Sequence, residues 1–363
     1  MITPRRLGVL LVAAVAALAI GFWLSSRRHV ETAPESGRLV LPELKGLLNS
    51  VTELRIAKGD GSRATLRKGG SDWTVVERGF PADGARVRKL LLDLSELTVV
   101  EEKTSDPQSY PQLGVEDVSS PKATGTRIDV VAPSKTSSLI VGKPSGGKSS
   151  FVRIAGAPVS LLASPQVVPD AEAARWLDRP VIDIAESRVK EVELQPASGP
   201  AYTVTRSSAQ QSDFSVTKIP TGRELSGPGG ANAVSGALTA LTLDDVRKAG
   251  GQGTEPAHAT FHTFNGLTVD VAGRKDGDRR FITLNAQSSA KETEAEAQTV
   301  NTRFSGWEIE VPGYKYDALF RPLEDLLKKP EPPAKKAGGK DKGGKSATPG
   351  PEKAPGGTGT PTP

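Results

Sequence analysis

The sequence predicts an α+β protein in which two tandem β-rich repeats, each with one main helix, follow an N-terminal transmembrane helix. Residues Val51 to Glu101 have the pattern of strands, a helix and a further strand, and Val189 to Lys248 have the same pattern in the same order. An uncharged apolar run, Leu7 to Leu24, precedes both. Short alternating runs bounded by glycine and proline follow each helix, which is typical of strands.

Length and composition exclude several classes of protein. The 363 residues are enough for two domains with their own cores. The absence of cysteine excludes a disulfide framework, a zinc–thiolate site and a cysteine nucleophile. Four arginines flank the apolar run, and six lysines against three acidic residues follow Pro330, so the whole excess of positive charge behind the net +5 lies at the chain ends. The rest of the chain is slightly acidic and is not expected to bind nucleic acid.

The apolar run is long enough to cross a membrane. Its 18 residues would span about 27 Å as a helix, close to the thickness of the hydrocarbon core. A signal peptide cleaved after Ala19 is the alternative, because Ala17-Leu-Ala19 has the small-x-small form of a cleavage site. The apolar run continues through Phe22 and Trp23, however, and aromatic rings favour the membrane interface. We therefore expect an uncleaved anchor.

The charges around this anchor are nearly balanced, with two arginines on each side. A six-residue head, 1–6, gains little from crossing, so we expect it to stay in the cytoplasm. The anchor, 7–24, would then cross the membrane as a single pass, with the body outside the cytoplasm. A polar linker is predicted at 25–49, and a disordered tail rich in proline, glycine and lysine at 330–363.

The first repeat is predicted at 50–184. Its opening hairpin turns at Gly59-Asp-Gly61, and Trp73 to Val76 form a third strand. Asp83 is placed to cap a helix whose apolar stripe has helical spacing. The members of that stripe are Val87, Leu90, Leu91, Leu94 and Leu97. The later predicted strands are Arg127–Val130, Leu139–Gly142, Ser150–Ile154 and Val159–Leu162.

The second repeat is predicted at 185–329. Strands at 192–194, 202–205 and 214–216 precede a helix with apolar residues Val234, Leu238 and Leu241. An insertion, Ala286 to Thr299, is rich in Glu, Ala and Ser and is predicted to be a solvated loop or a frayed helix. The later predicted strands are Ala259–His262, Thr268–Val271, Arg280–Leu284 and Trp307–Val311.

One stretch matches a phosphate-binding loop in its letters. Gly142-Lys-Pro-Ser-Gly-Gly-Lys148-Ser149 follows an apolar strand, and the pattern would use Lys148 and Ser149 on a nucleotide. That chemistry requires the loop to open a helix, whose N-terminus binds phosphate. The residues that follow, Ser150 to Ile154, alternate like a strand and are soon followed by Gly156. We therefore predict a hairpin loop, with a nucleotide site as the alternative.

Other motifs also favour structural interpretations. His258 and His262 have the spacing of a helical metal pair, but on a strand they would lie about 13 Å apart. Asp276-Gly-Asp278 lacks the ligand series of a calcium loop and is predicted to be a turn. Asp244 and Asp245 are predicted to be solvated near a helix end, and no G-x-S-x-G surrounds Ser235. No catalytic, cofactor-binding or metal-binding residue is therefore predicted, and no cofactor.

Several short stretches resemble a known family when taken in order. They are Asp72-Trp-Thr-Val75 with Asp83 and the leucine helix, Tyr110–Gly114, Leu139–Gly142, Phe151–Arg153, and Leu177–Ile182 leading into Val189–Leu194. In these stretches the chain resembles a bacterial family catalogued as domain of unknown function 4340, over about two thirds of its length. The resemblance implies a single-pass protein anchored in the bacterial inner membrane, with its body on the periplasmic or extracytoplasmic side. Such proteins are often encoded beside ABC-type transporters and gliding-motility-type auxiliary proteins. It implies no catalytic residues.

These observations together predict a non-enzymatic envelope protein. We expect an accessory or scaffold subunit of a membrane complex, with ABC-type transporter subunits as its protein partner. Two alternatives remain: an NTPase that uses Lys148 and Ser149, and a protein that binds an envelope polymer through the tail and exposed loops.

Overall fold

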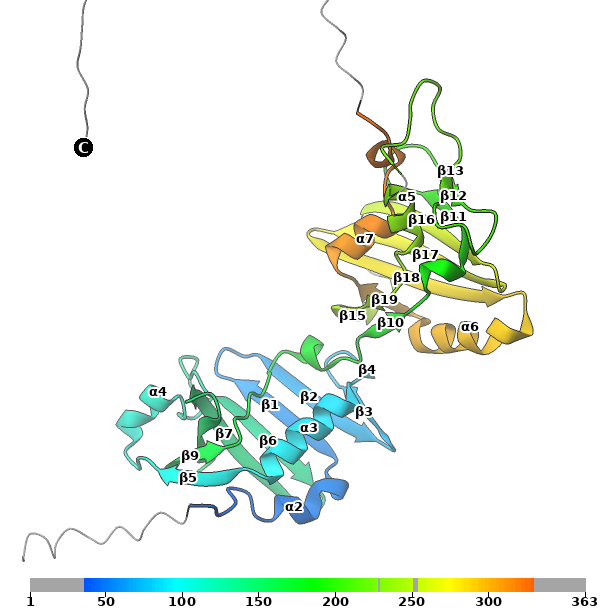
Figure 1. Cartoon of the computed structure of the whole chain (residues 1–363). Helices are drawn as coiled ribbons and strands as arrows, with labels where there is room; N and C mark the ends of the chain where they lie inside the picture. Colours follow the sequence, from blue (N-terminus) through cyan, green and yellow to red (C-terminus); the bar gives the residue numbers. More distant parts are fainter. Residues whose placement is uncertain (1–35, 228, 251–253, 330–363) are drawn as a thin grey trace, which may run out of the picture. The chain divides into compact units, whose positions relative to one another are not determined.

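The computed structural model describes residues 36–227, 229–250 and 254–329, in which short helices accompany antiparallel sheets (Figure 1). The predicted combination of helices and strands is confirmed, and the sheets are mostly antiparallel. The predicted anchor, the head and the tail lie outside the described residues.

The first large sheet has nine strands in the order β4-β3-β2-β1-β6-β7-β8-β9-β5. Each strand alternates between core and outer positions; β6, for example, buries Ile128 and Val130 and turns Arg127 and Asp129 outward. The predicted strands of the first half are confirmed. Their bounds are β1 Glu53–Lys58, β2 Arg63–Gly69, β3 Asp72–Val75, β4 Phe80–Pro81, β5 Thr98–Glu102, β6 Thr126–Ala132, β7 Lys135–Ser145, β8 Ser149–Ile154 and β9 Ser160–Ser164.

The second large sheet has eight strands in the order β13-β12-β11-β16-β17-β18-β19-β15. Its three long central strands again alternate, and the predicted strands of the second half are confirmed. The bounds are β11 Val189–Gln195, β12 Tyr202–Thr205, β13 Ser215–Val216, β15 Asp245–Lys248, β16 Thr254–Thr263, β17 Leu267–Asp276, β18 Arg279–Ser288 and β19 Trp307–Glu310. A separate pair is formed by β10 Pro180–Ile182 and β14 Leu241–Thr242.

Helix α3, Gly84–Ser95, is the main helix of the first half and lies on one face of the first sheet (Figure 1). Its cap is the predicted one, because the Asp83 carboxylate accepts hydrogen bonds from the backbone N–H groups of Ala85 and Arg86, both at 3.0 Å. The predicted apolar stripe is buried from Val87 to Leu97. The short helical segments of this half are α2 Leu44–Leu47, η1 Leu48–Ser50, η2 Pro107–Ser109, α4 Tyr110–Leu113 and η3 Ala173–Trp176, and η4 Glu186–Arg188 opens the second half.

The helix predicted around Val234, Leu238 and Leu241 is shorter than expected. Helix α5 covers Gly229–Ser235, and Leu241 already belongs to strand β14. All three apolar residues are nevertheless buried in the core. The chain leaves the helix where Gly236, a poor helix former, follows Ser235, and Ala240 takes a positive φ of 45° before β14.

The segment predicted as a solvated loop or a frayed helix, Ala286 to Thr299, is instead the end of strand β18 followed by most of an ordered helix. Helix α6, Lys291–Phe304, buries Ala297, Val300 and Phe304 against the core. The Asn301 side chain donates to the carbonyl of Ala286 at 2.7 Å and accepts from its N–H at 2.8 Å. It thus takes the place of a neighbouring strand along β18, where unpaired backbone groups would otherwise be costly. The remaining helices are α7 Gly313–Leu319 and η5 Leu323–Leu326.

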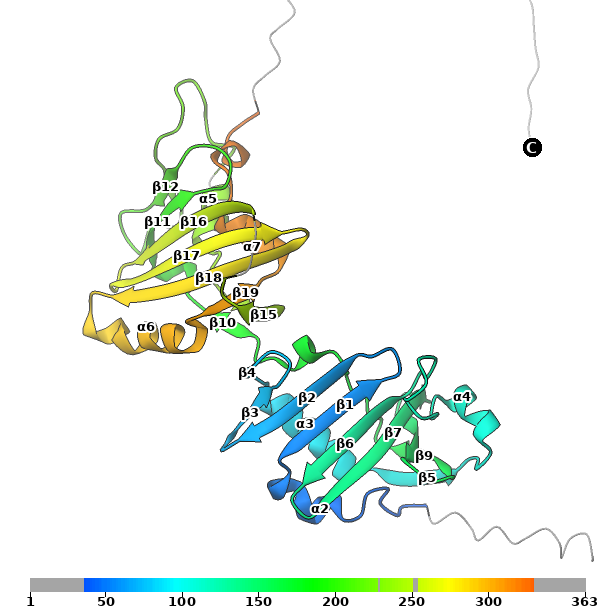
Figure 2. The same ribbon diagram turned by 180° about the vertical axis from the view of Figure 1, so that it is seen from behind.

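Among the residues that the structure describes, no helix covers the face of β16, β17 and β18 that is turned toward the viewer in Figure 2. Residues that point to this face along β17, including Thr268 and Asp270, are partly exposed, whereas Val269 and Val271 point into the core. The sheet therefore presents an open polar surface, as antiparallel sheets commonly do.

Glu53 gives the stability of the first sheet a dependence on pH. Burial raises the pKa of its carboxyl, but hydrogen bonds from Arg55 and Arg67 outweigh burial and hold the pKa below its ordinary value. Since the folded-state pKa lies below the unfolded one, the contribution is present above the unfolded pKa and is lost as pH falls through the folded pKa. We expect wild type to lose more stability than Glu53→Gln between about pH 6 and about pH 3. Urea unfolding at both pH values measures this, and parallel losses in the two proteins would contradict it.

Candidate functional site: the ionic network around Asp245 and Glu308

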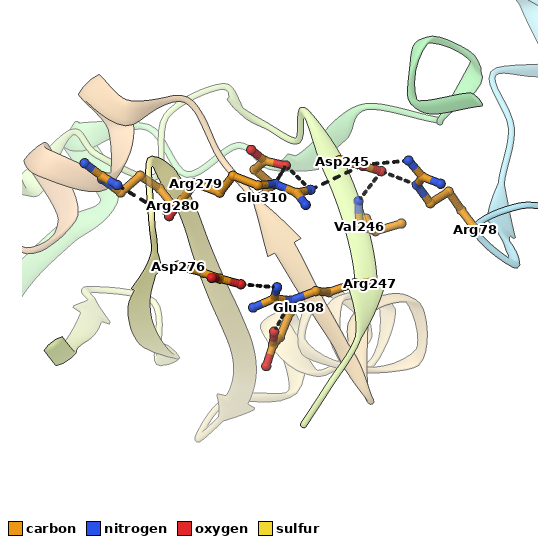
Figure 3. A network of polar contacts seen from close by, with 9 residues as sticks. All are labelled: Arg78, Asp245, Val246, Arg247, Asp276, Arg279, Arg280, Glu308 and Glu310. Carbon is orange, nitrogen blue, oxygen red and sulfur yellow. Dashed lines mark hydrogen bonds and ion pairs between the residues drawn. The ribbon is translucent and has the colours of Figure 1, made fainter. Parts of the chain in front are cut away.

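The densest group of paired charges in the described part of the chain lies on strands β15 and β19 (Figure 3). These strands pair so that Asp245 is opposite Glu310 and Arg247 is opposite Glu308. Directly opposite residues of an antiparallel pair share a face. The intervening Val246 and Ile309 are buried in the core. Strict alternation therefore gathers the four charged side chains on one side of the two strands.

Glu308 is the buried anion of this network, with 5% of its side chain exposed. Its carboxylate accepts a hydrogen bond from Nε of Arg247 at 2.7 Å and another from Arg274. Arg247 also donates to Asp276 at 2.6 Å, and this hydrogen bond lowers the pKa of the Asp276 carboxyl. Two guanidinium groups on one carboxylate offset the large cost of removing that charge from water.

Asp245 is the second centre of the network. Arg78, which precedes β4, binds it in a bidentate manner through Nε at 2.6 Å and Nη2 at 2.9 Å (Figure 3). The hydrogen bond to Asp245 also raises the pKa of Arg78. The expectation that Asp245 is solvated near a helix end is wrong, because the residue lies in a strand and only 15% of its side chain is exposed. Its partner is 167 positions away in the chain, so no local pattern signals the pair.

Aromatic rings support the arginines of the network. The Arg247 guanidinium lies 3.6 Å from the centroid of the buried Phe281 ring, and that of Arg279 lies 4.8 Å from the same ring. Arg279 also donates to Glu310. Each of the four carboxylates thus has an arginine partner, which is a suitable arrangement for holding strands in place rather than for accepting a substrate proton.

The phosphate-loop-like stretch lies in a hairpin, and that prediction is confirmed. Strand β7 ends at Ser145, β8 begins at Ser149, and the two strands pair directly. The turn residues Gly146 and Gly147 have φ of 61° and 73°, values that suit glycine. Lys148 and Ser149 therefore stand at the start of a strand, and the helix N-terminus that the nucleotide chemistry uses is not formed by the residues that follow.

The other motifs are placed as follows. His258 and His262 both lie on strand β16, as predicted, and the Asp276–Asp278 stretch forms the turn between β17 and β18, with Gly277 at φ 58°. Ser235 is buried and donates to the carbonyl of Asn232 at 2.9 Å, so its hydroxyl has a structural partner. Asp244 accepts a hydrogen bond from Arg179 and remains partly exposed.

The pair of Arg78 and Asp245 can be tested by a double-mutant cycle. We expect Arg78→Met and Asp245→Asn each to lower the free energy of unfolding, with a coupling energy of about 1–2 kcal/mol, because a bidentate, largely buried pair is lost in either case. The same cycle on the exposed pair Arg38 and Glu102, whose side chains are 44% and 49% exposed, should give less than about 1 kcal/mol. Equal coupling energies in the two cycles would contradict the prediction that the pair of Arg78 and Asp245 stabilises the fold more than an exposed pair does.

The fold and the network define a mixed helix-and-sheet protein whose charged side chains tie antiparallel strands together. The chain belongs to the family described as "Domain of unknown function (DUF4340)", whose model matches residues 73–263, just over half of the chain. The match begins in β3 and ends with β16, so it includes Arg78, Asp245 and Arg247 but not Glu308. Comparison with curated proteins gives no match, and neither does comparison with solved structures.

Among the described residues, the helices are too short or too polar to cross a membrane. The apolar run Leu7 to Leu24 lies outside this part of the chain.

Proposed function

We propose that this protein is a non-enzymatic, membrane-anchored component of the bacterial cell envelope, an accessory or scaffold subunit of a membrane complex. An ABC-type transport system is the partner that we favour, in keeping with the setting that the family resemblance implies. The observation that carries the scaffold role is the matching order of strands in the two large sheets. Two sheets of one topology on one chain provide two similar surfaces for protein partners.

The correspondence of the sheets supports a tandem repeat with units at 50–184 and 185–329. The order β3-β2-β1-β6-β7-β8-β9-β5 corresponds, strand for strand, to β13-β12-β11-β16-β17-β18-β19-β15. In the first sheet, β5 follows helix α3 in the sequence and pairs with β9, the last strand of the meander. In the second sheet, β15 follows helix α5 and pairs with β19 in the same way. Strand β4 and the additional helix α6 are the main differences between the units.

The proposed anchor would keep the first unit near the membrane. Residues 37–40 already bond to the chain at the start of β5: the Gly37 N–H donates to the carbonyl of Val99 at 2.9 Å, and the Val40 N–H donates to that of Leu97, just before the strand, at 2.8 Å. The chain from Leu24 to Gly37 can reach at most about 45 Å when fully extended. A partner of the first unit is therefore expected close to the membrane, either embedded in it or bound to its surface.

Site-specific photocrosslinking in intact cells tests this proposal. Probes would replace Leu92 on α3 and Tyr314 on α7, which are 49% and 70% exposed. The full-length protein should capture subunits of a membrane transporter, and the matched control is the same probe in a chain whose residues 7–24 are exchanged for a cleavable signal peptide. Capture of envelope polymer alone would favour the polymer-binding alternative, and no capture at either probe would count against the scaffold role.

The NTPase alternative has its own test. Lys148→Ala should leave both stability and cellular function unchanged if the stretch is only a hairpin turn. A loss of function with unchanged stability would instead support a nucleotide site and contradict the proposal of a non-enzymatic role.

A further inference from the structure

Two carboxylates and an imidazole lie together on the open face of the second sheet. Glu191 and Glu193 are two positions apart on β11, so both side chains point to the same face. His262 on the neighbouring strand β16 is directly opposite Glu191. One ligand atom from each of the three side chains lies within 4.8 Å of the other two.

A hydrogen bond with Thr268 orients the imidazole ring of His262. Nδ1 of His262 lies 3.2 Å from the hydroxyl oxygen of Thr268 on β17, while Nε2 lies 3.8 Å from a carboxylate oxygen of Glu193. In the tautomer in which Nδ1 donates to Thr268, the lone pair of Nε2 faces the two carboxylates. Histidines that bind metals are commonly oriented in this way, by a hydrogen bond from the other ring nitrogen.

The two glutamates lack the basic partners that the carboxylates of the ionic network have. Within the described residues, neither Glu191 nor Glu193 forms an ion pair with an arginine or a lysine; His262 is the partner of Glu193. The neighbouring outward positions on β12 and β16 are Thr203, Thr205 and Thr260. Two nearby negative charges thus face an open surface without compensation, which favours a bound cation.

We propose that Glu191, Glu193 and His262 bind a divalent transition-metal ion, with Zn²⁺ as the best match. Imidazole nitrogen with carboxylate oxygen suits zinc, whereas calcium and magnesium prefer oxygen ligands alone. Zinc bonds of about 2.0–2.2 Å require the ligand atoms to approach one another more closely than 4.8 Å. Rotation of the partly exposed glutamates brings them in, and a water completes the tetrahedral shell. This inference stands independently of the proposed envelope role.

The sequence offers a matched control for this site. His258 is four positions from His262 on the same strand and face, but it is opposite Gln195 and Ala272 instead of a glutamate. We would titrate the metal-stripped, detergent-solubilised full chain with ZnCl₂ by isothermal calorimetry. We expect one ion per chain, at least tenfold weaker binding in His262→Ala and in Glu193→Gln, and less than a twofold change in His258→Ala.

Thermal unfolding checks the fold separately. In EDTA all variants should unfold at the same temperature, and Zn²⁺ should stabilise wild type and His258→Ala more than His262→Ala and Glu193→Gln. If wild type does not bind one Zn²⁺ ion per chain, the proposal is overturned. Equal weakening by His258→Ala and His262→Ala would overturn it as well.

Discussion

Replacing Phe80 by alanine should lower the free energy of unfolding by about 3–5 kcal/mol. Phe80 is fully buried at the end strand β4 of the first sheet. Its ring centroid lies 5.2 Å from that of Trp307 in an edge-to-face arrangement at 82°, and 6.0 Å from that of Phe304. The substitution removes a large apolar surface and two aromatic contacts, and it leaves a cavity that the neighbouring side chains fill only in part.

The measurement is urea unfolding of the solubilised full chain followed by circular dichroism. Tyr314→Ala is the matched control, because it also removes an aromatic ring but from a site that is 70% exposed. We expect the control to cost less than about 1 kcal/mol. Phe304 and Trp307 belong to α6 and β19 in the second half of the chain. If Phe80→Ala unfolds in two steps where wild type unfolds in one, the aromatic contacts couple the unfolding of the two halves in wild type. A loss no larger than that of the control would contradict the prediction.

Replacing Glu308 by alanine should also cost about 3–5 kcal/mol. The change leaves Arg247 and Arg274, whose side chains are only 26% and 25% exposed, without their shared buried carboxylate. The penalty arises mainly from the two uncompensated cations rather than from the attraction that is lost. Arg247 keeps its bond to the more exposed Asp276, which limits the damage on that side.

Two comparisons separate this effect from a simple loss of side-chain volume. Glu308→Gln keeps the shape and one acceptor oxygen but removes the charge, so it should lie between wild type and Glu308→Ala. Glu102→Ala removes a glutamate that is 49% exposed and paired with Arg38, and it should cost no more than about 1 kcal/mol. If Glu308→Ala lowered the free energy of unfolding no more than Glu102→Ala does, the prediction that the network stabilises the fold would be wrong.

Much of the local structure could be predicted from short-range patterns. The alternation of apolar and polar residues identified the strands of both sheets, and Asp83 with its leucine stripe identified α3. Helix α6 was underestimated, although Glu and Ala favour helices, because its buried face has few large apolar residues: Thr293, Ala297, Val300 and Phe304. Its stability comes from packing and from the bonds of Asn301 to Ala286, which hydrophobic periodicity does not reveal.

The charged sites illustrate the limit of such patterns. A run such as Asp244-Asp245 has the local appearance of a solvated pair, and only the folded chain brings Arg78 onto Asp245. Likewise, sequence spacing pairs His258 with His262, whereas the carboxylate oxygens that lie near His262 belong to Glu191 and Glu193 on strand β11. Sequence spacing reports neighbours along one element, and strand pairing creates neighbours across elements.

The sequence by itself determined the class of fold, the places where strands and the capped helix form, the hairpin nature of the phosphate-loop-like stretch, and membership of the family. These features follow from periodicity and turn residues, which act over a few positions. The tertiary structure alone decided which charges are buried together, which strand edge α6 covers, and which carboxylates meet His262. Those contacts depend on the register and order of strands far apart in the chain, because a one-residue shift would turn each side chain to the other face.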